Sequence, residues 1–438
     1  MWRSNRFLII YYALLLLVFA SRQGTVAHPL ILRVAFMVAV FLPCIISRNV
    51  SFPAIVTLFT TLTSYGFAYS YMPYMLYIYA GLTLLFSFYY LSNAKGIHNL
   101  PGFLTLFAFY LLIIDSITGA YNSGAHFPED SFYCFLILIC FSLISRDDKT
   151  RSYEQMSLCF MMITIVLSLY FLLNRDAFAV NYDPYQEFER IGWIDPNYFG
   201  TVLGMGVVMA LISLFDVKRK DRPLALRIVS VFTVVVALPV LLLNASRGAI
   251  LSVAVSGVVL FMFTKVKVGY KVLLVIIVAA AMVYLYNNQY MDLLAYRISS
   301  DDSGGSGRVS IWLSKLRAFF HGGLFHVLFG FGYVGGLNVS GYFIGFHNDF
   351  LAFLVDYGIV GLGLFLYMMI YPILRTPRNS VQYPQVLGIV GFLVITGITL
   401  EPMNGGRLPY YVFYLQALLL ANSISNKKIS RQLVRNEE

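Results

Sequence analysis

Apolar runs recur along nearly the whole chain and are separated by short polar segments. A bilayer core about 30 Å thick is crossed by roughly 20 apolar residues in a helix, and the runs do not alternate as barrel strands do. Because backbone groups in lipid need partners within the helix, the pattern predicts an all-α integral membrane protein, a polytopic helical bundle of about 12–14 transmembrane helices. The runs lie at 7–20, 30–46, 52–68, 73–91, 103–121, 131–145, 156–173, 198–215, 226–244, 249–264, 271–287, 350–373, 383–400 and 408–424.

The composition agrees with this interpretation. Of 438 residues, 59% are hydrophobic and 12% are charged, whereas a soluble domain has about a quarter charged residues. The first run follows Arg3 and Arg6 without a small-residue cleavage site before a soluble domain, so we expect it to be retained as a span. The cysteines lie within apolar runs and show no disulfide or zinc spacing; they are Cys44, Cys134, Cys140 and Cys159.

Lysine and arginine are distributed unequally between the two sides of the predicted bundle. The richer side includes the runs 218–222 and 265–271 and both termini, so the positive-inside rule predicts that the termini are cytoplasmic. The net charge of +10 therefore reflects topology, and no nucleic-acid partner is expected. The poorer side carries almost only arginine, whose planar fork suits phosphate and carboxylate groups. We therefore expect the chemistry on the periplasmic face.

One long segment, Asn288 to His347, interrupts the otherwise short loops. It divides the chain into an N-terminal transmembrane bundle (1–287), a large periplasmic loop (288–347) and C-terminal transmembrane helices with a cytoplasmic tail (348–438). Helical spacing of apolar residues predicts a short amphipathic helix in this loop, lying on the outer leaflet or capping the bundle, with Lys315 and Arg317 off its stripe. The stripe consists of Val309, Trp312, Leu313, Leu316, Phe319 and Phe320.

Two further features of this loop carry candidate chemistry. The segment from Gly330 to Gly336 fits G-x-G-x-x-G, but no strand–turn–helix unit surrounds it, so a dinucleotide site is rejected and no cofactor is expected. The glycines are expected to permit a tight turn or close approach of a ligand. At the end of the loop, His347 can accept a proton at the membrane surface, and Asn348 or Asp349 can cap the next helix.

Four motifs occur in a characteristic order over residues 190–365, and through them the chain resembles the O-antigen ligase and polymerase superfamily. Many members carry Glu where this chain has Asp356. The motifs are Arg190-Ile191-Gly192-Trp193 before Asp195-Pro196-Asn197; Asn244-Ala245-Ser246-Arg247-Gly248-Ala249; Arg308 and Trp312 before the Gly330/Gly332 turn; and His347-Asn348 followed by Asp356-Tyr357-Gly358-Ile359-Val360-Gly361.

The resemblance implies a bacterial inner-membrane enzyme that acts on glycan linked to undecaprenyl diphosphate by metal-independent, inverting transfer. His347 would deprotonate the attacking sugar hydroxyl. The diphosphate would be bound by Arg190, Arg247 and Arg308, because preorganised cations stabilise its developing charge. Further residues are expected to line the same cleft or shape its loops; they are Asp195, Asn197, Asn348, Glu401 and Arg407.

Three functions remain open at this point. A polymerase would extend glycan on a lipid-linked repeat unit, and a ligase would attach finished glycan to a lipid A core; a chain-length regulator is a further candidate partner. A polysaccharide transporter or flippase is the third possibility, but its sites usually contain ionisable groups inside the membrane. Here only Arg33 and Asp115 look buried in the membrane, and no internal repeat is visible. Each arginine also has a structural alternative, such as capping a helix or pairing at the surface.

Overall fold

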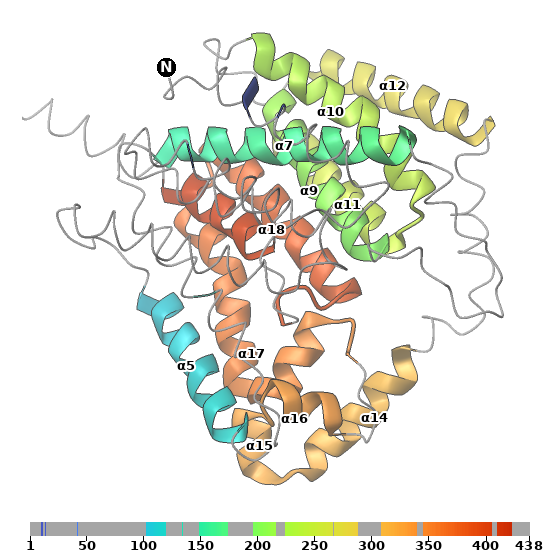
Figure 1. The fold of residues 1–438 in the computed structure, drawn as a ribbon. Helices are drawn as coiled ribbons and strands as arrows, with labels where there is room; N and C mark the ends of the chain where they lie inside the picture. Colours follow the sequence, from blue (N-terminus) through green and yellow to red (C-terminus); the bar gives the residue numbers. More distant parts are fainter. Residues whose placement is uncertain are drawn as a thin grey trace, which may run out of the picture.

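The computed structural model describes residues 102–119, 149–173, 196–215, 224–265, 267–287, 308–339, 345–404 and 410–422, together with Ile10, Tyr11, Leu14, Leu42 and Cys134. Throughout this described part the regular elements are helices (Figure 1). They are α5 (Gly102–Gly119), α7 (Lys149–Leu173), α9 (Pro196–Phe215), α10 (Leu224–Leu243), α11 (Arg247–Phe263), α12 (Val268–Asn287), α14 (Arg308–His321), α15 (Gly323–Phe329), α16 (Tyr333–Asn338), α17 (Asp349–Arg375) and α18 (Gln382–Thr399), followed by a helix at 410–422.

The all-α membrane fold predicted from the apolar runs is confirmed. Among the described residues, five helices are long and apolar enough to cross a membrane, and two further apolar helices are slightly shorter. The predicted runs 7–20, 30–46, 52–68, 73–91 and 131–145 lie outside the described residues apart from single positions. The total number of spans therefore stays a prediction.

Helices α9 and α10 show how the bundle meets lipid. In α9, 83% of the apolar window is buried, whereas in α10 the share is 39%. The exposed side of α10 is nonetheless apolar, with Ile228, Val231, Phe232 and Val235 all at least 45% exposed. Their spacing places them on one helix face. An outward apolar stripe of this kind is expected where a helix contacts lipid instead of water.

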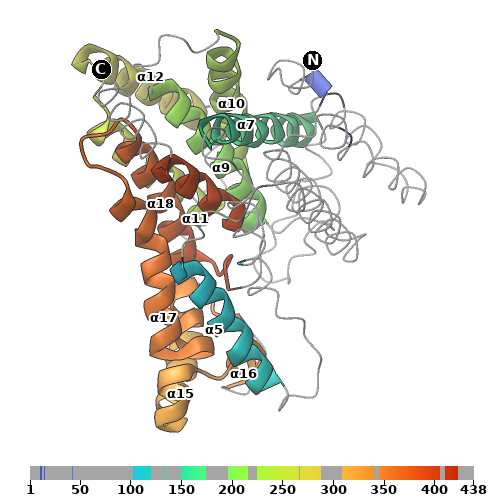
Figure 2. The same cartoon turned by 90° about the vertical axis from the view of Figure 1, so that its left-hand side faces the viewer.

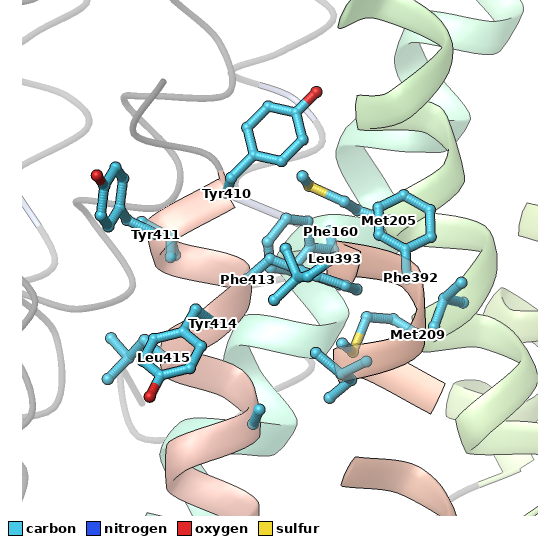
Figure 3. Packing of buried hydrophobic residues seen from close by; sticks show 14 of the residues in the cluster. Phe160, Met205, Met209, Phe392, Leu393, Tyr410, Tyr411, Phe413, Tyr414 and Leu415 are labelled. Carbon is cyan, nitrogen blue, oxygen red and sulfur yellow. The ribbon is translucent and has the colours of Figure 1, made fainter. Parts of the chain in front are cut away.

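The core is built around the helix at 410–422 (Figure 3). The ring of Phe413 lies 5.3 Å from the ring of Phe160 in α7 and 5.3 Å from that of Phe392 in α18. The Tyr414 hydroxyl donates to the Met368 carbonyl of α17 at 2.7 Å. Aromatic packing and a satisfied hydroxyl therefore hold this last helix against three others.

Helix α17 is interrupted at Gly358, where φ is 69°. The carbonyls of Val355 and Asp356, just before the break, accept hydrogen bonds from the N–H groups of Phe331 (3.1 Å) and Gly332 (2.7 Å). Gly330 has φ 83°, and a Cβ there would overlap the Asp356 carbonyl. The glycine string thus makes the tight turn expected of it, and its close approach is to the backbone of α17.

Over its described residues, 308–339 and 345–347, the large loop contains three helices where the sequence predicted one. Helices α14, α15 and α16 gather around the part of α17 that is broken at Gly358, on the side where α5 also lies (Figures 1 and 2). The predicted range of α14 is confirmed, and the members of its apolar stripe differ in burial. Trp312, Leu316 and Phe319 pack inward, whereas the remaining members are 44% to 63% exposed; these are Val309, Leu313 and Phe320.

Lys315 corrects the amphipathic interpretation, because it was predicted to lie off the apolar stripe and is nonetheless fully buried. A lysine can be buried when hydrogen-bond acceptors and opposite charges surround it. Its partners come from Gly336, Asp356 and Glu401, which lie in other segments. Helical periodicity within residues 308–321 contains no information about them.

Candidate functional site

Five helix ends meet at one end of the bundle, and Thr399 at the end of α18 lies among them. The Arg308 Nη1 atom, at the start of α14, donates to the Thr399 carbonyl at 2.7 Å. At the start of α11, a Cβ added to Gly248 would lie 2.5 Å from Thr399 Oγ1. Two arginine motifs that are separate in the sequence, those of Arg247 and Arg308, therefore reach the same region of the bundle.

The start of α9 joins this region through Asn197. The Ser246 hydroxyl, at the N-cap of α11, donates to Asn197 Oδ1 at 3.3 Å. The helices pack closely behind this contact, since a Cβ on Gly200 would lie 3.1 Å from the Ala249 Cβ. Asn197 thus holds the two helix starts together, as expected for a residue that shapes the loop.

His347 lies at a constrained position directly before α17. Its φ of 51° is in the left-handed region, which residues other than glycine rarely adopt. The preceding residue, Phe346, is held by two hydrogen bonds. Its N–H donates to Glu401 Oε2 at 2.6 Å, and its carbonyl accepts from Trp312 Nε1 at 2.7 Å.

A third contact to Phe346 comes from Lys315, whose Nζ lies 4.3 Å from the centre of the Phe346 ring. Trp312 and Lys315 are four and seven residues after Arg308, so all three project from one face of α14. This face meets the end of α18 and the backbone that carries His347. The spacing of Arg308, Trp312 and Lys315 along the helix was visible in the sequence. It is the signal by which Lys315 could have been identified as a residue of the site.

Asn348 and Asp349 attach the start of α17 to the end of α18. The Asn348 side chain accepts from the Leu351 N–H at 3.1 Å, which confirms its predicted capping role, and donates to the Ile398 carbonyl at 3.2 Å. Asp349 Oδ1 accepts from the N–H groups of Met403 (3.0 Å) and Asn404 (2.9 Å). The turn 401–404, which carries Glu401, is therefore fixed to α17.

A buried charged cluster lies beneath the His347 segment. Lys315 is 0% exposed and Asp356 is 1% exposed. Lys315 donates to the Gly336 carbonyl at 3.1 Å, and Asp356 accepts from Asn404 Nδ2 at 2.6 Å. Burial lowers the pKa of Lys315, while the Asp356 and Glu401 carboxylates oppose this shift. Lys315, Asp349 and Asn404 were absent from the predicted site because their partners are distant in sequence.

The predicted site residues divide into two groups. The structure places Asn197, Arg247, Arg308, His347, Asn348 and Glu401 at the same end of the bundle. Arg190, Asp195 and Arg407 lie outside the described residues. Within the described part of the chain, no group of three or more His, Cys, Asp and Glu side chains could hold a metal ion.

Apolar helices with lipid-facing stripes define a multi-pass membrane protein, and a polar site at one end of these helices fits an enzyme of the membrane surface. Residues 232–366 match the family model described as O-Antigen ligase. This match supports the resemblance to the O-antigen ligase and polymerase superfamily that the motifs indicated. The matched segment contains Arg247, Arg308, His347 and Asp356. A comparison with curated proteins gives no match.

The match also supports a coarse function, which is membrane glycan transfer of the O-antigen ligase and polymerase type by a glycosyltransferase-like enzyme.

Proposed function

We propose that this protein transfers glycan from an undecaprenyl diphosphate donor to a sugar hydroxyl on the periplasmic face of the bacterial inner membrane, as a polysaccharide polymerase. The observation that carries the proposal is the convergence of the Arg247, Arg308 and His347 segments at one end of the bundle. These residue types match the needs of the reaction, which are a cationic site for a diphosphate and a base for a hydroxyl.

Arg247 and Arg308 are proposed to stabilise the leaving diphosphate. A hydrogen bond from Arg308 to a helix-end carbonyl orients the guanidinium without neutralising its charge. Arg247 is the first residue of α11, where the helix dipole also favours an anion. Cations held in place before the reaction lower its barrier, since they need no reorganisation as charge develops. We propose that Arg190, from the first of the four motifs, completes this set.

His347 is proposed as the general base. The acceptor hydroxyl oxygen forms a bond to the anomeric carbon of the donor while the bond from that carbon to the phosphate oxygen breaks. The electron pair leaves with the diphosphate, and the hydroxyl proton goes to the imidazole. Attack opposite to the leaving group inverts the anomeric configuration. In this scheme arginines supply the charge stabilisation that a metal ion provides in other transferases.

Trp312, Lys315 and Glu401 are proposed to position this base. All three contact Phe346, the residue directly before His347. The left-handed backbone at His347 would relax if these contacts were lost, because such a conformation persists only where its surroundings hold it. Misplacing a base by about 1 Å can lower a rate by roughly two orders of magnitude.

A ligase is the second candidate, and the description of the matching family model favours it. Ligase and polymerase share the donor and differ in the acceptor, which is a lipid A core for one and another lipid-linked repeat unit for the other. A transporter function would leave Arg247, Arg308 and the constrained His347 without a role.

Deletion of the gene in its host, with surface glycan resolved by size, separates these candidates. Loss of the ladder with a single repeat left on the lipid A core supports the polymerase. Loss of all glycan from the core, with long chains kept on the undecaprenyl carrier, supports the ligase. Glycan precursors retained on the cytoplasmic face would contradict both and indicate a transporter.

The role of His347 is tested in the same strain. We expect His347→Ala to lower transfer by about 10²- to 10⁴-fold, as loss of a general base does. The control is His321→Ala, which removes an exposed imidazole from the end of α14. A His347→Ala variant that inserts stably and restores a normal ladder would show that another group acts as the base.

A further inference from the structure

A cavity lies at the opposite ends of the helices that form the candidate site. Helices α9, α11 and α17 begin at that site and α18 ends there, and the cavity of about 350 Å³ is formed where α9, α11 and α17 end and α18 begins. It is therefore about one helix length away from His347. Its lining consists of Phe215, Phe263, Thr264, Lys265, Arg378, Asn379, Ser380, Val381, Tyr383 and Pro384.

The lining of this cavity is cationic and rich in hydrogen-bond donors. Lys265 and Arg378 supply two positive charges, and the lining includes no acidic residue among those the structure describes. Hydroxyl and amide groups come from Thr264, Asn379 and Tyr383. Two cations with several neutral donors form the kind of site that an oxyanion fills, and an arginine fork matches phosphate in particular.

Ser380 supplies an independent indication of a ligand. Its Oγ atom is buried and has no hydrogen-bond partner within the described part of the chain, and the residue lines the cavity. Buried hydroxyl groups are usually hydrogen-bonded, so this hydroxyl is available to a ligand in the cavity. A phosphate oxygen in the cavity would accept this hydrogen bond.

We propose that this cavity binds a phosphate group, and specifically the headgroup phosphate of an anionic phospholipid. Its volume is at the lower end of the range for small-ligand sites and suits a headgroup better than a whole lipid. Phe263 and Val381 in the lining are 53% and 37% exposed, so apolar surface continues outward from the charged residues. Basic pockets between transmembrane helices on the cytoplasmic side bind lipid headgroups in this way.

The location agrees with the topology predicted from charge. Lys265 and Arg378 belong to the side of the chain that is rich in lysine and arginine, which the positive-inside rule places in the cytoplasm. Anionic lipid headgroups are available there to an inward-facing pocket. The proposal is independent of the glycan-transfer chemistry, because none of its lining residues belongs to the candidate site.

The test uses the purified full-length protein in detergent. Short-chain phosphatidylglycerol, phosphatidylcholine and inorganic phosphate are titrated separately, and binding is followed by native mass spectrometry and by the melting temperature. The wild-type protein is expected to bind phosphatidylglycerol and not phosphatidylcholine. Each of Lys265→Gln and Arg378→Gln should weaken binding about fivefold, the effect of one basic residue near an anionic headgroup. Ser380→Ala should weaken it less.

The matched control is Lys267→Gln, which removes an exposed lysine two residues beyond Lys265 that does not line the cavity. If this variant weakens binding as much as Lys265→Gln does, diffuse surface charge explains the binding and the proposal is wrong. Binding that is equal for both lipids, or unchanged in all variants, also overturns it. Saturable binding of inorganic phosphate at the same affinity as the lipid, lost in Lys265→Gln, supports the phosphate site and assigns it to a soluble ligand.

Glycan transfer measured on the same variants keeps the two proposals separate. Lys265→Gln and Arg378→Gln are expected to weaken lipid binding about fivefold and to retain glycan transfer, whereas His347→Ala is expected to lower glycan transfer and to bind the lipid as the wild type does.

Discussion

The two ends of the helix bundle carry charge in different ways. At the His347 end, Lys315, Asp349 and Asp356 are at most 1% exposed and are hydrogen-bonded to other segments. At the opposite end, Lys265 and Arg378 are exposed side chains that line an open cavity. Buried charges require partners fixed in space and so make a region rigid. Exposed charges remain available to orient the chain in the membrane and to meet a ligand.

The difference should appear most strongly in stability. Lys315→Ala would leave the Asp356 and Glu401 carboxylates without the ammonium that they face, and we expect it to lower the free energy of unfolding by about 3–5 kcal/mol. Lys267→Ala at the other end should leave stability nearly unchanged. Melting curves of the two purified variants provide the comparison. Equal melting curves would mean that the buried charged cluster contributes no more to stability than the exposed charges at the other end.

The next effect concerns the geometry of Arg308 and not its charge. Arg308→Lys keeps the positive charge but loses the planar fork that reaches Thr399, so we expect transfer to fall by about 10- to 100-fold without loss of insertion. Arg317→Lys, on the exposed side of the same helix, should retain normal transfer. A normal rate for Arg308→Lys would show that charge alone is needed at that position.

A smaller effect is expected from the contact between α14 and the His347 segment. Trp312→Phe keeps an aromatic ring but removes the hydrogen bond to the Phe346 carbonyl, worth about 1 kcal/mol. We expect kcat to fall about fivefold while KM for the lipid-linked donor is unchanged, since only the position of the base is disturbed. Phe320→Leu, which alters an exposed ring on α14, is the control. A rise in KM alone would instead indicate a role in donor binding.

The smallest effect concerns pH. The pKa of Lys315 is lowered in the folded protein from its ordinary value of 10.5, so between these two values the unfolded chain binds more protons than the folded one. Stability therefore rises with pH in that window. The melting temperature of the wild type, minus that of Lys315→Met, should increase as pH approaches 10.5. If the difference in melting temperature falls with pH, the pKa of Lys315 is not lowered by folding.

The sequence predicted the helices far better than it predicted the site. The run predicted at 198–215 corresponds to α9 at Pro196–Phe215, and the run at 383–400 corresponds to α18 at Gln382–Thr399. Such agreement is expected, because apolar length is a property of consecutive residues. The helical start at Arg308 and the cap at Asn348 were also local signals.

Contacts between distant segments had no comparable signal. The interior face of α14 depends on Phe346, Asp356 and Glu401, which follow it by up to about ninety positions. Apolar spacing placed Lys315 off the apolar stripe of α14, whereas the structure buries it completely. A hydropathy pattern ranks side chains by their free energy of transfer between water and lipid. It takes no account of a hydrogen-bond or charge partner from a distant segment that lowers the free energy of burial.

The amino-acid sequence by itself determined that the chain forms apolar helices, which superfamily its motifs resemble, and which arginines and histidine are candidates for its chemistry, because these properties depend on residue types and short spacings. Only the tertiary structure decided that the starts of α11 and α14 meet at Thr399, that α14 holds the residue before His347, and that Lys265 and Arg378 line one cavity. Those relations depend on how helices pack, and packing is set by contacts between residues that are far apart in the chain.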